Sequence, residues 1–271
     1  MNFMDKLHKA IDKRDSLVCL GLDPDPELMP DIGILEFNKA IIDATCDLVG
    51  AYKANLAFYE AAGIDGLTAL MKTVEYIPED IPIIGDAKRG DIGNTARHYA
   101  KAIFETLGFD SVTVNPYLGY DAVEPFLSYH DKGVFLLCRT SNSGAADFQS
   151  LSCLSPDSCE QKPLFAVVAQ KAKEWNKHGN MGLVAGATYP EELKLIRMIC
   201  PDMMLLIPGI GAQEGDLARA IHCTMPAKGQ RAIFASSRRI LYASKGHDFA
   251  QAAREAAGQL RTNINSILNS D

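Results

Sequence analysis

The chain has 271 residues, of which 47% are hydrophobic and 23% charged, and its formal net charge is −7. This composition is typical of a soluble globular protein and unlike that of a disordered or collagen-like chain. The acidic balance, without any Lys/Arg-rich tract, argues against a general nucleic-acid or anionic-membrane surface, and no apolar run approaches the ~18 residues that span a bilayer.

The N-terminal residues and the cysteines indicate a cytoplasmic protein. Near the N-terminus, charged residues alternate with Phe3, Leu7 and Ile11 at helical spacing, which predicts a short amphipathic helix and not a signal peptide. The seven cysteines are an odd number, and Cys19 and Cys138 lie in apolar runs, where a buried reduced thiol is the ordinary interpretation. No Cys or His spacing typical of structural zinc occurs, so we expect no metal.

Short apolar segments rich in β-formers recur eight times along the chain. They are continuous apolar stretches more than alternating ones, as parallel strands covered on both faces require. Segments with helical spacing of apolar residues lie between them. The predicted strands are Ser16–Asp23, Ala51–Leu56, Ile81–Lys88, Ser111–Pro116, Gly133–Thr140, Met181–Thr188, Met203–Ile210 and Arg231–Ser237.

This alternation of strands and helices predicts an α/β fold, a single-domain (β/α)8 TIM barrel over residues 1–271. Helix ends are marked by Pro190 just inside a start, Gly108 just past an end and Asp248 as an N-cap. A doubly wound sheet is the alternative. It usually stops nearer five or six strands, and no G-x-G-x-x-G follows the first strand here.

One connection is long for a barrel loop. After the fifth strand, at about residues 143–162, the chain is polar and rich in Ser, Cys and Pro, and helical spacing returns only at Pro163–Trp175. We expect this segment to be an excursion near the active face.

Polar residues collect where the predicted strands end, which in such barrels is where catalytic groups lie. An unpaired buried charge costs several kcal/mol or more, so charges at these positions must pair with one another or with a ligand. A structural ion-pair cluster that closes the barrel mouth is the alternative. The positions are Asp23, Lys53, Asn55, Asp86, Lys88, Asn115, Thr140, Ser141, Thr188, Pro208–Gln213, Ser237 and Arg238.

The third strand carries the most informative pattern, D-x-K-x-x-D. Asp86 and Lys88 are two residues apart on a strand and so share a face, whereas Asp91 lies beyond the strand end. Alone the pattern is weak. Together with other motifs it resembles the orotidine 5′-phosphate decarboxylase family; these motifs are Asp86–Asn94 (DAKRGDIGN), Lys53 in YKAN, Pro208–Gln213 (PGIGAQ) and Ser236-Ser237-Arg238.

The matches span nearly the whole chain in the family's order. They look most like the longer bacterial branch, because Thr140-Ser141-Asn142 opens an extended loop and Val114–Gly119 follows the fourth strand. One departure is Ser143, which stands where a proline is expected. A proline would fix φ and the path of the loop at this position, so a loop with Ser143 lacks that source of rigidity.

The resemblance implies a reaction and its catalytic groups. The family converts orotidine 5′-monophosphate to uridine 5′-monophosphate and CO2 in de novo pyrimidine biosynthesis, without a cofactor, through a carbanion-like centre at C6. By resemblance, Lys53, Asp86, Lys88 and Asp91 form an alternating catalytic network, and Asp91 reaches into the partner's site in a homodimer. Lys88 is the expected general acid, because an ammonium can protonate C6.

The resemblance also implies the contacts of a nucleoside monophosphate. Asp23, with Lys53, is expected at the ribose, Ser141 at the pyrimidine and Thr95 at the partner's ribose. The phosphate end also has its own rationale: the Pro208–Gln213 turn offers N–H groups and the Gln213 amide, and Arg238 follows the eighth strand. Adjacent Arg239 is expected on the surface.

Three other functions are compatible with parts of this pattern. A phosphosugar enzyme with the same D-x-K-x-x-D would use a magnesium-stabilised enediolate, for which Glu60 is the candidate carboxylate. A Schiff-base aldolase would use Lys53 or Lys88 and is disfavoured by the carboxylates that keep both lysines charged. A catalytically silent nucleotide-binding barrel is disfavoured because all four charged positions are present.

Overall fold

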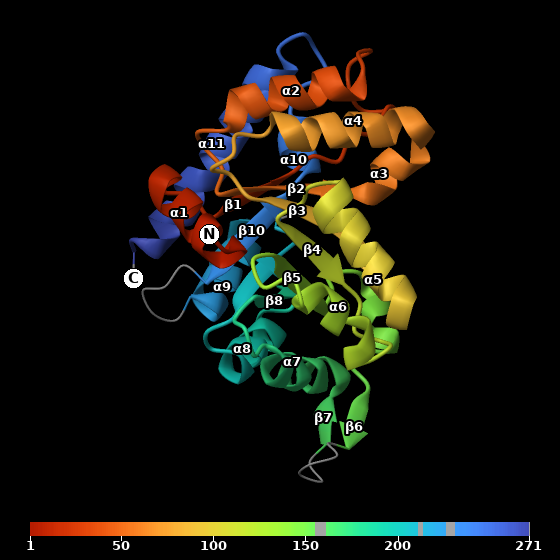
Figure 1. The fold of residues 1–271 in the computed structure, drawn as a ribbon. Helices are drawn as coiled ribbons and strands as arrows, with labels where there is room; N and C mark the ends of the chain where they lie inside the picture. The colour runs from red at the N-terminus through yellow and green to blue at the C-terminus, as the bar shows by residue number, and fades with distance from the viewer. Residues whose placement is uncertain (155–160, 211–213, 226–230, 271) are drawn as a thin grey trace.

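The predicted strands form one closed parallel barrel in the computed structural model, which describes residues 1–154, 161–210, 214–225 and 231–270 (Figure 1). Each barrel strand pairs with the next, and β10 closes the ring by pairing with β1. The (β/α)8 prediction is therefore confirmed, and the doubly wound alternative is wrong because the sheet closes. The barrel strands are β1 (Val18–Gly21), β2 (Ala51–Asn55), β3 (Ile83–Arg89), β4 (Ser111–Val114), β5 (Gly133–Arg139), β8 (Met181–Ala185), β9 (Met204–Ile207) and β10 (Ala232–Ser236).

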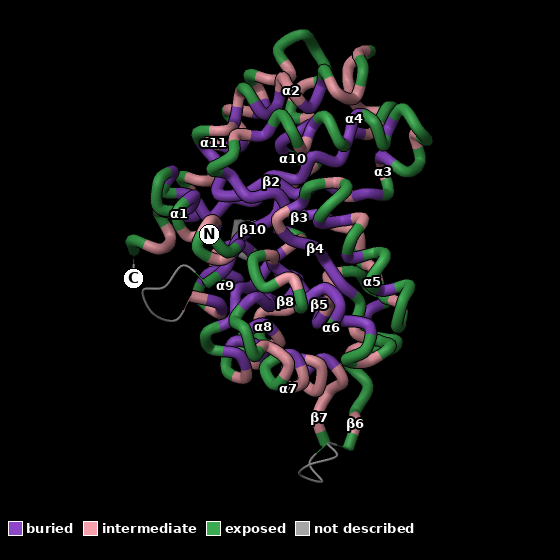
Figure 2. The backbone as a smooth tube through the Cα atoms, in the orientation of Figure 1, coloured by how far each residue is buried: buried purple, intermediate pink, exposed green. Residues whose placement is uncertain are grey.

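The barrel strands are mostly buried (Figure 2). This is expected where side chains fill the inside of a barrel and helices cover its outside. In β1, β4, β8, β9 and β10 every residue is buried. The strand β3 differs, because Asp86, Ala87 and Arg89 at its carboxyl end are half-buried and Lys88 is exposed. The charged end of β3 thus faces the open end of the barrel.

The helices lie outside the barrel and bury one face each. In α2 the buried face contains Phe37, Ile41 and Thr45, as the helical spacing predicts. Gly108 has a φ of +75° just past the segment that extends α5, and Pro190 begins α8. The helices are α2 (Ile34–Thr45), α3 (Leu56–Ala61), α4 (Gly63–Tyr76), α5 (Gly93–Lys101) with the π-turn Ala102–Thr106, a 3-10 turn Tyr120–Ala122, α6 (Glu124–Leu127), α7 (Leu164–Trp175), α8 (Pro190–Ile199), α9 (Glu214–Thr224), α10 (Arg238–Leu241) and α11 (Phe249–Leu268).

Asp248 occupies the predicted N-cap position before α11, but its side chain does not form the hydrogen bond of an N-cap. Its Oδ1 instead accepts a hydrogen bond from the Ser244 hydroxyl at 2.6 Å. The carboxylate therefore stabilises the preceding turn and leaves the first N–H groups of α11 without a side-chain cap.

The N-terminal helix α1 (Phe3–Arg14) covers the amino-terminal end of the barrel. The ring of Phe3 packs edge-on against Phe135 of β5, with centroids 5.9 Å apart. Lys6 pairs at 2.8 Å with Asp110, just before β4. With this end covered, the carboxyl ends of the strands form the open face.

The segment 143–162 is not irregular throughout. It begins with a 3-10 turn at Ser143–Asp147 and includes the antiparallel strands β6 (Ser152–Leu154) and β7 (Gln161–Pro163), which project away from the barrel (Figure 1). The sequence did not indicate this hairpin, because its strands have three residues each and no apolar alternation.

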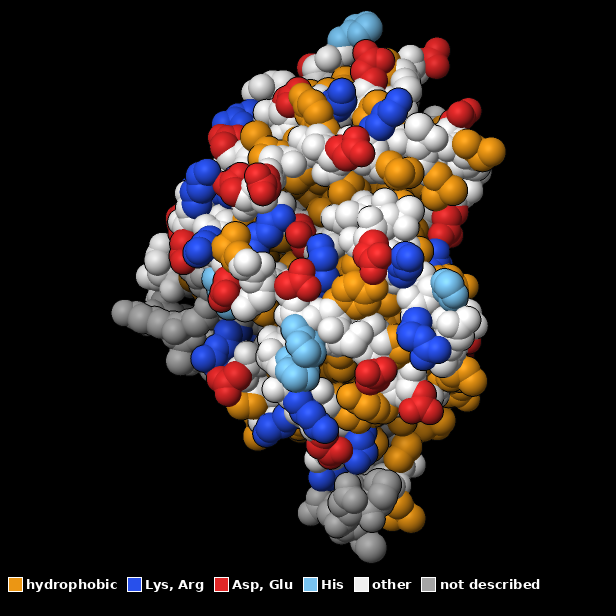
Figure 3. Space-filling model, viewed as in Figure 1, with side chains coloured by type: hydrophobic (Ala, Val, Ile, Leu, Met, Phe, Trp, Pro, Cys, Tyr) orange, Lys and Arg blue, Asp and Glu red, His pale blue; other side chains and the backbone are white. Residues whose placement is uncertain are grey.

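The surface carries charges of both signs. On the face seen in Figure 3, Lys and Arg side chains are interspersed with Asp and Glu, so that face has no field of a single sign. Within the described residues, no helix combines the length and the apolar character that crossing a membrane requires.

Candidate active site

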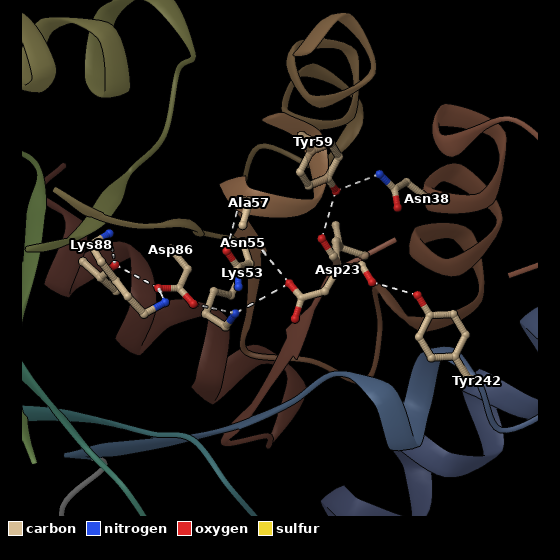
Figure 4. A network of polar contacts seen from close by, with 11 residues as sticks. Asp23, Asn38, Lys53, Asn55, Ala57, Tyr59, Asp86, Lys88 and Tyr242 are labelled. Atoms are coloured by element: carbon tan, nitrogen blue, oxygen red, sulfur yellow. Dashed lines mark hydrogen bonds and ion pairs between the residues drawn. The ribbon is translucent and has the colours of Figure 1, made fainter. Parts of the chain in front are cut away.

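A row of four alternating charges lies at the carboxyl ends of β1, β2 and β3 (Figure 4). The Lys88 Nζ lies 2.7 Å from Asp86 Oδ1, and the Lys53 Nζ lies 3.2 Å from Asp86 Oδ2. On its other side, the Lys53 Nζ lies 3.7 Å from Asp23 Oδ1. The carboxylate of Asp86 thus bridges two ammonium groups, and the Lys53 ammonium lies between two carboxylates.

Lys53 and Asp86, at the centre of the row, keep their charges at neutral pH. Burial alone would lower the pKa of Lys53, but the carboxylates of Asp23 and Asp86 raise it above its ordinary value. Burial alone would raise the pKa of Asp86, but Lys53 and Lys88, with a hydrogen bond from Thr113, lower it to about 2. A Schiff base needs an unprotonated amine, so this environment disfavours Lys53 as its site.

The two lysines differ in access. The Lys53 side chain is 8% exposed and the Lys88 side chain 48% exposed. A molecule that enters from the open end of the barrel can therefore reach the Lys88 ammonium more readily than that of Lys53.

The backbone at Lys88 departs from a regular strand. Its φ is +47°, in the left-handed region, and the pairing register of β3 with β4 shifts between Gly85 and Arg89. Non-glycine residues rarely adopt this conformation, and such residues cluster at functional sites. The irregularity accompanies the 2.7 Å contact between Lys88 Nζ and Asp86 Oδ1.

Thr113 of β4 supports this part of the row and was missed in the sequence. Its hydroxyl accepts a hydrogen bond from the Lys88 N–H at 2.9 Å and donates one to Asp86 Oδ1 at 2.9 Å. It thereby takes the place of a regular ladder bond at the register shift. The sequence signal that could have identified Thr113 is a hydroxyl side chain within a buried apolar strand, because a buried hydroxyl needs a hydrogen-bond partner.

The structure of one chain does not bring Asp91 and Thr95 into the row. Asp91 is half-buried, and its Oδ1 accepts a hydrogen bond from the adjacent Ile92 N–H at 2.8 Å. Within the described ranges it forms no salt bridge. Thr95 is exposed in the first turns of α5.

The loops after β5, β8 and β9 meet on another side of the open face. The Thr188 hydroxyl donates a hydrogen bond to the Ser141 carbonyl at 3.5 Å. Gly209 has a φ of +86°, and a Cβ there would lie 3.2 Å from the Cβ of Ser141. The half-buried Pro208 thus begins a turn that packs against Ser141. The other predicted residues of this turn, Gly211, Ala212 and Gln213, lie outside the described residues.

The start of the loop after β5 is held by Arg139 and Gln149, which were also missed. Gln149 Oε1 accepts a hydrogen bond from the Thr140 N–H at 2.8 Å, and its amide donates one to the Thr140 hydroxyl at 2.9 Å. Arg139 is 2% exposed, pairs with Glu192 and stacks over Tyr189 at 4.0 Å. Side-chain contacts therefore support the segment in which Ser143 replaces the expected proline.

The chain after β10 approaches the end of β1. A Cβ at Gly21 would lie 1.9 Å from the Ser237 hydroxyl, so glycine is required for this approach. Arg238 and Arg239 follow and are both exposed on α10. The beginning of α10 is thereby close to the strand that leads to Asp23.

Glu60, the candidate magnesium ligand, lies on α3 and pairs with Arg89. Among residues 1–154, 161–210, 214–225 and 231–270, no three His, Cys, Asp or Glu side chains are grouped so that they could hold a metal ion.

Comparison with known proteins gives a consistent result. The family described as Orotidine 5′-phosphate decarboxylase / HUMPS matches residues 16–256. A protein of Dehalococcoides mccartyi named orotidine 5′-phosphate decarboxylase is 53% identical over 266 residues, which cover 98% of each chain. One of Thermomicrobium roseum with the same name is 50% identical over 274 residues, 98% of this chain and 96% of the relative.

Solved structures agree in fold. The OMP decarboxylase of Leishmania donovani superposes with a TM-score of 0.87 at 37% identity, over 98% of this chain and 99% of the other. A Toxoplasma gondii protein described as a putative orotidine-monophosphate-decarboxylase superposes with a TM-score of 0.88 at 36% identity, over 99% and 98%.

Proposed function

The chain belongs to the orotidine 5′-phosphate decarboxylase / HUMPS family, and from this premise we propose that it converts orotidine 5′-monophosphate to uridine 5′-monophosphate and CO2 in pyrimidine biosynthesis. It is a carboxy-lyase. The observation that carries the proposal is the part of the row formed by Lys88, Asp86 and Lys53. There the exposed Lys88 ammonium lies beside the Asp86 carboxylate, which Lys53 holds in place. No cofactor is needed for this chemistry.

The mechanism rests on electrostatics. As the bond between C6 and the carboxylate breaks, CO2 leaves and the electron pair stays on C6. The Lys88 ammonium stabilises this developing negative charge and then transfers a proton from Nζ to C6, after which water reprotonates the amine. Asp86, hydrogen-bonded by Thr113 and paired with both lysines, holds Lys88 in position.

The remaining residues bind the nucleotide. We assign the ribose hydroxyls to Asp23 with Lys53, and the pyrimidine to Ser141. The phosphate is assigned to Pro208, Gln213 and Arg238, of which Arg238 offers a charged bidentate donor. The closeness of Ser237 to Gly21 supports this arrangement, since it brings the phosphate end near the ribose end.

The first test is the reaction itself. Purified protein should remove the absorbance of orotidine 5′-monophosphate and produce uridine 5′-monophosphate, and the activity should survive a chelator such as EDTA. Absence of turnover would contradict the proposal. Magnesium-dependent turnover of a sugar phosphate would favour the enediolate alternative, and trapping by borohydride would reveal a Schiff base.

We also propose a homodimer with two shared sites, in which Asp91 completes the partner's row and Thr95 contacts the partner's ribose. Exposed apolar side chains in the two chain segments at Asp91 and Asn115 support it: Ile92 is 56% and Tyr117 82% exposed. Their two segments adjoin, because a Cβ at Gly90 would lie 3.1 Å from the Asn115 carbonyl. The described cysteines are free thiols, which suits a cytoplasmic location.

Subunit mixing tests the shared sites. Asp91→Ala and Lys88→Ala homodimers should both be inactive, whereas an equal mixture should recover about a quarter of wild-type activity, since half the dimers are mixed and each has one native site. The matched control mixes Lys53→Ala with Lys88→Ala, which should recover nothing because both residues come from one subunit's row. No recovery in the first mixture, despite verified exchange, would contradict shared sites.

A further inference from the structure

Two tyrosine hydroxyls hold the main chain on either side of the Asp23 Cα (Figure 4). The Tyr59 hydroxyl donates a hydrogen bond to the Leu22 carbonyl at 2.9 Å. The Tyr242 hydroxyl donates one to the Asp23 carbonyl at 2.8 Å and accepts one from the Asp25 N–H at 2.7 Å. Neither tyrosine belongs to the row of charges, and both lie against the residue that ends it.

The segment after Asp23 has few hydrogen-bonding groups of its own. Its sequence is Asp23-Pro24-Asp25-Pro26, and proline has no N–H. Asp25 therefore supplies the one main-chain N–H among residues 24–26, and that N–H binds Tyr242. One hydroxyl thus pairs with the carbonyl before Pro24 and the N–H after it, and so fixes the path of the chain at this turn.

Tyr242 is itself held in place. Its ring stacks on Phe37 of α2, with centroids 6.1 Å apart and an angle of 15° between the planes. Its N–H donates a hydrogen bond to the Arg238 carbonyl at 3.1 Å. Burial raises the pKa of Tyr242 to about 12, so the hydroxyl keeps its proton at neutral pH and can donate it to the Asp23 carbonyl.

Tyr59 is anchored in the same way from the opposite direction. It is fully buried, and its hydroxyl accepts a hydrogen bond from the Asn38 amide at 2.9 Å. The Asn38 amide also donates to the Thr73 hydroxyl at 3.0 Å, which connects α2 and α4 to the same point. The end of β1 is therefore bound to the surrounding helices through side chains.

The Asp23 carboxylate depends on this main-chain path. Its Oδ1 accepts a hydrogen bond from the Asn55 N–H at 3.1 Å and lies 3.7 Å from the Lys53 Nζ. We propose that Tyr242, with Tyr59 as a second anchor, is a positioning residue for the decarboxylation, because it directs the Asp23 carboxylate toward Lys53 and the ribose. This inference rests on the proposed function.

A double-mutant cycle tests the inference. Tyr242→Phe keeps the ring and removes the hydroxyl, and should lower kcat/KM for orotidine 5′-monophosphate about tenfold, as expected for one hydrogen-bonding group. In an Asp23→Ala background, Tyr242→Phe should lower kcat/KM less than about twofold, because the carboxylate that Tyr242 positions is no longer present. The matched control is Tyr129→Phe, a half-buried tyrosine whose hydroxyl donates to Glu105, and it should leave kcat/KM unchanged.

Three outcomes would overturn the inference: an undiminished kcat/KM in Tyr242→Phe, losses that multiply in the double variant, or an equal loss in Tyr129→Phe. Denaturant unfolding checks that each variant is folded. If Tyr242→Phe fails to fold, Tyr59→Phe replaces it in the cycle, and multiplying losses there count equally against the inference. Absence of turnover in the wild-type protein would instead contradict the proposed function.

Discussion

Replacing Lys88 with alanine should lower kcat about 10⁴-fold or more while leaving the protein folded. Loss of the proton donor alone accounts for ~10²–10⁴-fold. Removal of the ammonium that faces the developing carbanion adds a loss of ~10²–10³-fold. Folding should survive because the Lys88 side chain is 48% exposed, and Asp86 keeps Lys53 and Thr113 as partners.

A second substitution separates the two roles of Lys88. Lys88→Arg retains a positive charge, but a guanidinium does not release its proton, so kcat should stay low. The control is Lys39→Ala, which removes a lysine that lies over the Tyr76 ring on the outside of the barrel and should leave kcat unchanged. A folded Lys88→Ala protein with near-normal turnover would refute the assignment of Lys88 as general acid.

Arg238→Ala should lower kcat/KM about 10²-fold although the row of charges is untouched. A charge-assisted contact with phosphate supplies up to ~3 kcal/mol, and each ~1.4 kcal/mol is tenfold. If this remote binding energy helps to organise the reacting end, its loss will appear in the rate as well as in binding. Steady-state kinetics with orotidine 5′-monophosphate and the affinity for uridine 5′-monophosphate measure both effects.

Guanidinium ion and the neighbouring arginine supply the controls. Free guanidinium should partly restore Arg238→Ala, because it can occupy the vacated space with the missing charge, and it should not restore Lys88→Ala. Arg239→Ala removes an exposed arginine from the same short helix α10 and should have little effect. Unchanged nucleotide affinity in Arg238→Ala, with a loss in Arg239→Ala, would transfer the phosphate contact to Arg239.

The amino-acid sequence by itself determined the fold and the strand ends at which the charges lie. Continuous apolar runs such as Met203–Ile210 are typical of strands buried on both faces, and their number leaves a closed barrel as the consistent arrangement. Consecutive parallel strands are neighbours, so Lys53 at the end of one and Asp86 at the end of the next had to be close. The roles of these residues came from the family resemblance.

Only the tertiary structure decided how the row is held. The left-handed backbone at Lys88 and the bond from Thr113 depend on a register shift between two strands, which no local pattern encodes. Tyr242 lies 219 positions from Asp23 in the chain, and the hydrogen bond between them forms because the barrel closes β10 onto β1. Periodicity reports which face of an element is buried, whereas such contacts depend on how distant elements pack, and for that reason they appear only in the folded chain.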